Sequence, residues 1–187
     1  MCGHDLEMKE ARVAGLLEEY PTARDAGRGH SALRGVGEVG WVGSSCPGST
    51  PALLECLPDT AAGVEAVRVL AKVLLDDLFT LNKAAPLLLG FVLGLADELH
   101  AATRRELVEW LVVVAGLAEP VRDGLDPRIL GGEAGEDRPE WARCRGVLIE
   151  HADVLRELVR TAGGVDADSL AVLLAPAPPV TFQGAVT

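Results

Sequence analysis

Apolar residues recur at helical spacing over most of this chain. In residues 1–21 they fall three or four positions apart among charged residues, and Pro21 closes the pattern. An apolar stripe of this kind predicts a short amphipathic helix that needs a partner to cover it. The residues of the stripe are Leu6, Val13, Leu16, Leu17 and Tyr20.

The helical pattern vanishes between residues 22 and 50. Glycine recurs there at positions 27, 29, 35, 37, 40, 43 and 48. Because glycine loses more backbone freedom on ordering than any other residue, this spacing weakens any regular element. We expect residues 22–50 to form an irregular glycine-rich connector, which Trp41 and Val42 tether to the core.

Regular helical signals return after the connector. Ser49 or Thr50 can cap a short helix that begins at Pro51, since a hydroxyl accepts hydrogen bonds from free N–H groups and proline suits the first turn. Leucines give this helix an apolar face, and Pro58 ends it.

Two longer apolar segments follow. Asp59 or Thr60 can cap a helix whose apolar stripe runs to about Phe79. Pro86 then opens a helix that is apolar on nearly every side as far as Leu95. A helix without a polar face belongs in the interior, so we expect this one at the centre of the molecule.

The next helix carries a start signal of its own. The sequence Thr103-Arg104-Arg105-Glu106 matches a capping box, in which the hydroxyl and the carboxylate each satisfy a backbone donor. This predicts a helix over residues 107–117. The glycines, prolines and acidic residues of 119–138 then predict a loop of about twenty residues, long enough to be either functional or loose.

Helix is expected again from Pro139, with an apolar face that continues to Val159. A last short helix is expected over residues 167–174, after a cap at Asp166. Residues 176–187 contain three prolines and little apolar surface, so they should form a flexible tail. The main helical domain then spans residues 51–175.

Composition supports an all-α fold and restricts the partners. Aromatic residues make up only 4% of the chain, and leucine, valine and alanine carry most of the 49% hydrophobic content, which favours helix packing. The formal net charge is −11. That charge disfavours binding to nucleic acid or to a membrane surface, and it favours another protein with a basic surface as the partner.

The chain also carries compartment signals. No basic segment followed by an apolar core opens it, and the apolar run 84–96 is too short for the ~20 residues that cross a bilayer. The four cysteines are too widely spaced for a zinc knuckle or a disulfide framework. We therefore expect a cytoplasmic protein.

The spacing of the helices also carries a family resemblance. The helix pairs over 51–79 and 84–117 begin at prolines thirty-five residues apart, and their threonine caps lie forty-three apart. This is near the ~40–47 residues of stacked HEAT repeats. Three motifs add to the spacing: a tryptophan segment before Pro51-Ala52-Leu53-Leu54, the turn into Ala84-Ala85-Pro86-Leu87-Leu88, and the later Leu155-Arg156-Glu157-Leu158-Val159.

In these motifs the chain resembles small bacterial HEAT-repeat proteins over about two-thirds of its length. The resemblance implies an irregular stack of about three antiparallel helix pairs. It also implies a binding surface, because members of such families act mostly as interaction scaffolds.

Two sites invite a catalytic interpretation, and each has a simpler explanation. Removal of Met1 would expose Cys2 as an N-terminal nucleophile, but glutamine amidotransferases that begin this way continue into β-strands, whereas a polar helix is predicted here. Asp76-Asp77 is comparable with the aspartate-rich magnesium motif of class I terpene cyclases and prenyltransferases. Adjacent helical residues diverge by about 100°, and no third acid follows one turn later, so we expect a solvated helix end.

The remaining candidates also favour structural roles. Cys56 and Cys144 lie among apolar neighbours and should be small core residues. The glycines of 35–43 match no phosphate-binding loop. The four histidines lack metal-ligand spacing, and neither Glu98 with His100 nor Glu150 with His151 pairs on a helix. We predict no catalytic residue, no metal site and no cofactor; the histidines are His4, His30, His100 and His151.

Acidic residues concentrate in 7–19 and 133–140, which form either solvated faces or a docking surface for a basic partner. We therefore expect a non-catalytic protein-protein interaction or accessory protein. The alternative is a small helical enzyme that binds an apolar ligand between Leu87–Leu95 and Leu107–Leu117, oriented by Trp110 or Asp77. A third hypothesis is an accessory domain that its partner stabilises.

Overall fold

A computed structural model of the protein describes residues 3–77, 80–118 and 139–162. This part of the chain is mostly helical, with one two-stranded antiparallel pair, so the all-α prediction is confirmed. The elements in chain order are α1 (Gly3–Glu19), α2 (Arg24–Gly27), the 3-10 helix η1 (Ser31–Leu33), α3 (Thr50–Cys56), α4 (Gly63–Leu74), β1 (Leu75–Asp77), β2 (Thr80–Leu81), α5 (Ala85–Gly94), the 3-10 helix η2 (Ala96–Glu98), α6 (Ala101–Ala118), α7 (Pro139–Glu150) and α8 (Ala152–Ala162).

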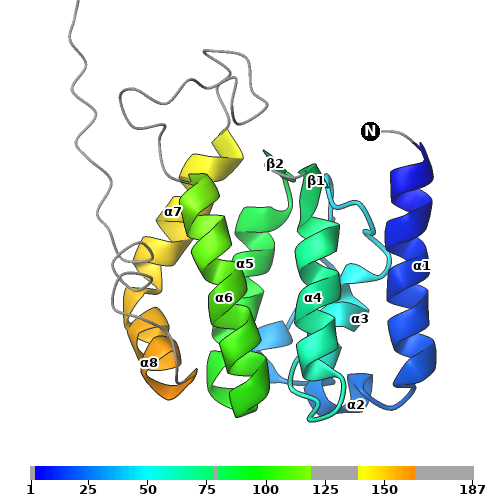
Figure 1. The fold of residues 1–187 in the computed structure, drawn as a ribbon, viewed down its shortest axis with the longest axis horizontal. Coiled ribbons are helices and arrows are strands. Elements are labelled where there is room, and N and C mark those ends of the chain that lie inside the picture. The colour runs from blue at the N-terminus through cyan, green and yellow to red at the C-terminus, as the bar shows by residue number, and fades with distance from the viewer. Residues whose placement is uncertain (1–2, 78–79, 119–138, 163–187) are drawn as a thin grey trace, which may run out of the picture.

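The helices form two layers. In the first layer α1 packs against α4, α4 against α6, and α6 against α8. Figure 1 shows α1, α4 and α6 side by side, with α3 and α5 behind them. In the second layer α2 packs against α3, and α5 against α7. Each layer covers the apolar face of the other.

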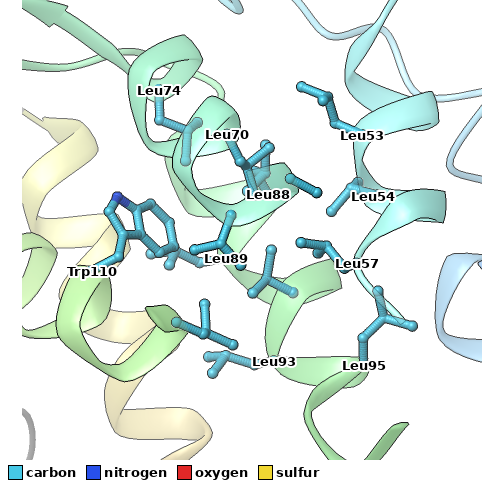
Figure 2. Packing of buried hydrophobic residues seen from close by; sticks show 14 of the residues in the cluster. Leu53, Leu54, Leu57, Leu70, Leu74, Leu88, Leu89, Leu93, Leu95 and Trp110 are labelled. Carbon is cyan, nitrogen blue, oxygen red and sulfur yellow. The ribbon is translucent and has the colours of Figure 1, made fainter. Parts of the chain in front are cut away.

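A leucine-rich core fills the space between the layers. Leu53 and Leu54 of α3 and Leu57 just after it point toward leucines of α4 and α5, and Trp110 of α6 lies beyond Leu89 (Figure 2). These leucines are fully buried, and one continuous cluster includes them all. Burying each such side chain contributes roughly 1.5–3 kcal/mol, so this cluster is the main source of stability. The helix predicted over residues 86–95 was expected at the centre of the molecule. Its inner face does lie in this core.

Helix α4 ends earlier than its sequence pattern predicts. The apolar stripe continues to Phe79, but the helix stops at Leu74, and Leu75 is extended at the start of β1. The side-chain amide of Asn82 donates to the Val73 carbonyl at 2.8 Å, and its backbone N–H donates to the Leu74 carbonyl at 2.9 Å. These bonds satisfy carbonyls that a helix end leaves free, so the chain can turn back into β2.

The predicted capping box at Thr103–Glu106 is wrong, because α6 begins two residues earlier, at Ala101. Thr103 lies inside the first turn and is buried. Glu106 instead accepts two hydrogen bonds from Arg68 of α4, at 2.9 and 3.0 Å. The box residues therefore join two helices and do not start one.

The predicted connector, residues 22–50, is largely irregular, but it also contains α2 and η1. Trp41 is confirmed as its tether: the indole N–H donates to the Val36 carbonyl at 3.0 Å, and the ring lies 5.7 Å from that of Phe91. Val42 is not a tether, since 83% of it is exposed. Gly27 lets α2 approach α3 closely, because an added Cβ would lie 2.5 Å from the Glu55 carbonyl.

The helix predicted from Pro139 to Val159 is divided at His151 into α7 and α8. The imidazole Nδ1 lies 3.0 Å from the Val147 carbonyl, which also accepts the His151 backbone N–H. A side chain that joins the backbone hydrogen bonds in this way interrupts a helix. The predicted loop 119–138, the last helix 167–174 and the tail 176–187 lie outside the described residues.

A close contact between α4 and α6 gives a stability test. An added Cβ at Gly63 would lie 2.5 Å from Thr103 Oγ1 and 2.6 Å from the Leu57 carbonyl oxygen. We expect Gly63→Ala to lower the free energy of unfolding in urea by about 1–3 kcal/mol through overpacking. Gly146→Ala on α7 is the control, because nothing lies within 4 Å of its added Cβ, and it should raise stability by up to about 1 kcal/mol. Equal effects of the two variants would contradict the contact.

Candidate interaction surface

Helix α1 lies at one edge of the first layer and packs on α4 through a narrow stripe. Lys9, Val13, Leu16 and Tyr20 are four, three and four residues apart, so they share one side of the helix. Val13 and Leu16 are buried in the core, while Tyr20 is partly buried. The amphipathic helix predicted for residues 1–21 is confirmed over residues 3–19.

Lys9 fixes this helix to the end of α4. Its side chain is only 6% exposed, and Nζ donates to the Leu75 carbonyl at 2.5 Å and to the Ser45 hydroxyl at 3.3 Å. Leu75 is the C-cap of α4, where aligned peptide dipoles place negative charge and stabilise a cation. One ammonium group therefore joins α1, the connector and α4.

The opposite side of α1 is open and acidic. Glu7, Ala11, Ala14 and Glu18 repeat the four-three-four spacing, and all four are exposed. Glu10 and Glu19 are also exposed, whereas the only other lysine or arginine of the helix besides Lys9 is Arg12. We call Glu7, Ala11, Ala14 and Glu18 the outer stripe of α1. Small side chains separate its two carboxylates, which lie about 16 Å apart at 1.5 Å per residue.

The pKa of Tyr20 reports the negative charge at the end of this helix. A hydrogen bond to Glu19 raises the pKa of the phenol above its ordinary value, and the charge of Glu19 raises it further, followed by burial and by Glu65 and Asp59. All these causes act in the same direction. Glu19 at the end of α1 and Asp59 and Glu65 near the start of α4 therefore all act on the Tyr20 hydroxyl.

The cysteines are not available as nucleophiles in the described part of the chain. Cys46, Cys56 and Cys144 are free and buried. Burial raises the pKa of Cys56 to about 11 and of Cys144 to about 12, and it also raises that of Cys46. Because the thiolate is the reactive form, the prediction that Cys56 and Cys144 are core residues is confirmed. Cys2 lies outside the described residues.

The histidines are separated and serve local contacts. His30 accepts a hydrogen bond from the Ala32 N–H and lies 3.7 Å from Glu98, His100 contacts Thr60 at 2.9 Å, and His151 stands at the α7–α8 break. Of these three, His100 is exposed and the other two are partly buried. Within the described residues no group of three His, Cys, Asp or Glu side chains could hold a metal ion. The side chain of His4 lies outside the described part.

The other candidates also change their setting in the structure. The sequence predicted a helix end at Asp76 and Asp77, but both residues lie in strand β1. Their side chains are outside the described part of the structure. The two segments proposed as walls of an apolar pocket, Leu87–Leu95 and Leu107–Leu117, contribute their buried residues to the core, together with Trp110. None of the described helices is long and apolar enough to cross a membrane.

Sequence reasoning missed two residues that position α1 and the connector. Lys9 is a charged residue of the first helix, but its spacing from Val13, Leu16 and Tyr20 places it on the same side as the apolar stripe. Arg24 of α2 forms an ion pair with Glu55 of α3 at 2.7 Å, and no sequence pattern relates these two positions. Comparisons with protein-family models, curated proteins and solved structures found no match.

The role of Lys9 can be tested by removing its charge while keeping its length. Lys9→Met leaves the Leu75 carbonyl without its buried donor, so we expect the free energy of unfolding in urea to fall by about 1–3 kcal/mol. Arg12→Met makes the same change of charge on the exposed side of α1 and should alter stability by no more than about 0.5 kcal/mol. The anchor would be refuted if both variants unfolded at the wild-type urea concentration.

Proposed function

We propose that the protein is a non-catalytic interaction protein, in which a HEAT-like helical scaffold presents the outer stripe of α1 to a basic segment of another protein. The observation that carries the proposal is the contrast between the two sides of α1. Its inner side is fixed by buried apolar residues and by Lys9. Its outer side exposes glutamates and small residues at regular spacing.

The order of helix contacts supports the scaffold. α3 packs against α4 and α7 against α8, while α5 packs mainly against α7, and α4, α6 and α8 form a row. Repeated pairs stacked in a row are the plan of HEAT-like proteins, in which each pair contacts mainly its neighbours. In this arrangement α1 extends the row by one helix at its N-terminal edge.

The chemistry of the outer stripe favours a basic helix or extended segment as the ligand. Two basic side chains about 16 Å apart would meet Glu7 and Glu18. Ala11 and Ala14 between them allow the partner backbone to approach closely. The net charge of −11 steers a cationic partner toward the protein from a distance.

The proposal is tested by affinity capture from a lysate of the source organism, followed by elution with salt. One bait is the wild type. A second bait carries Glu7→Gln, Glu10→Gln and Glu18→Gln on α1. A third carries Glu38→Gln, Glu109→Gln and Glu150→Gln, which are exposed elsewhere in the described chain. Both variants lose the same charge, so any difference between them is due to position.

We expect the wild type and the third bait to retain a protein with a basic surface, and the α1 variant to lose it. Salt should release this protein, since exposed ion pairs are screened. Retention of the same protein by all three baits, or of no protein by the wild type, would refute the proposed function.

A further inference from the structure

The outward face of α1 has no partner within the described part of the chain. Helix α1 lies at one edge of the first layer and packs mainly against α4 (Figure 1). Every residue of the outer stripe is exposed, and so are Met8 and Gly15 beside it. Nothing lies within 4 Å of a Cβ added at Gly15. This face is therefore open to another molecule over the middle turns of the helix.

Only small side chains stand in the middle of this face. Ala11 lies three residues from Ala14 and four from Gly15, so the three share the outward side. We call them the small-residue middle of α1. Met8, one turn before Ala11, is 49% exposed, and Glu18 follows one turn after Ala14. A bulky apolar side chain of a partner can enter this space and pack against the flexible Met8 thioether.

The backbone of α1 restricts the conformation of the partner. In the middle of a helix the main-chain N–H and C=O groups bond to one another, so this face offers none of them to an incoming chain. An extended segment laid along it would lose water from main-chain groups that find no new partner, and that loss is costly. A helical segment satisfies its own main chain and avoids this cost.

We propose that the segment recognised by α1 is an amphipathic basic helix that crosses α1 at Ala11 and Gly15; this inference rests on the proposed function. Small residues at the crossing let the two helix axes approach to about 8–10 Å. A large apolar residue of the partner packs in the small-residue middle, beside Met8. Lysines or arginines on either side of that residue meet Glu7 and Glu18.

Charge determines which kind of helix fits this face. Over residues 6–19 four glutamates are exposed against one arginine, namely Glu7, Glu10, Glu18 and Glu19 against Arg12. A second copy of the chain, with its own net charge of −11, would be repelled. A basic helix from a different protein is attracted instead, and its apolar side matches the uncharged middle of the face.

Fluorescence anisotropy with two synthetic peptides tests the helix. Both peptides contain the same lysines, leucines and alanines and are about 18 residues long, which gives five helical turns. In the first peptide lysine and leucine recur at helical spacing, and in the second they alternate as in a strand. We expect the wild type to bind the first peptide at least about 10-fold more tightly than the second.

Variants of two open glycines test where the peptide binds. Gly15→Leu fills the small-residue middle of α1, whereas Gly146→Leu makes the same change at an exposed, open position of α7. Both helices should persist, since leucine favours a helix more than glycine does. We expect Gly15→Leu to weaken binding of the helical peptide by about 10-fold and Gly146→Leu to leave it unchanged.

Equal binding of the two peptides, or equal effects of the two glycine variants, would overturn the helical partner. The variant with Glu7→Gln, Glu10→Gln and Glu18→Gln separates this failure from that of the proposed function. If it weakens both peptides alike, α1 still binds a basic segment and only the helical form is wrong. If it binds both peptides as the wild type does, the proposed function fails as well.

Discussion

The structure depends on how the buried end of α4 satisfies its backbone carbonyls. A helix end leaves its last carbonyls without partners inside the helix, and burying them unpaired is costly. Here Asn82 donates to Val73 and Leu74, and Lys9 donates to Leu75. The same bonds bring the start of α5 and the middle of α1 against α4. The need to pair the carbonyls at the end of α4 therefore positions one helix of each layer, α1 in the first and α5 in the second.

The leucine core and the hydrogen bonds at the end of α4 have different structural roles. Leucines of α3, α4 and α5 interlock between the layers and supply most of the stability (Figure 2). Apolar packing is not directional, so by itself it leaves the rotation of an edge helix weakly specified. The bond from Lys9 fixes that rotation, because its ammonium reaches the Leu75 carbonyl from only one side of α1. The glutamates on the opposite side then face outward.

The sequence predicted most helices, because a 3.6-residue period and prolines at helix starts are local signals, as at Pro51, Pro86 and Pro139. It failed where tertiary contacts decide the outcome. The end of α4 depends on Lys9, which is distant in sequence, and on Asn82, which follows β2. Thr103–Glu106 forms contacts between helices in place of a cap. The acidic character of α1 was visible in the sequence. The position of Lys9 determines which side of α1 faces outward. As a lysine, Lys9 is expected on the surface, but it is buried here.

The proposed function joins these parts: a rigid helical row holds α1, and α1 offers acidic groups at fixed spacing. Hydrogen–deuterium exchange on the complex with the captured basic protein tests this claim most directly. We expect slower exchange in peptides covering residues 6–19, where the outer stripe lies, with exchange in α6 unchanged. Protection confined to other helices, with residues 6–19 exchanging as in the free protein, would show that the partner does not bind the outer stripe of α1.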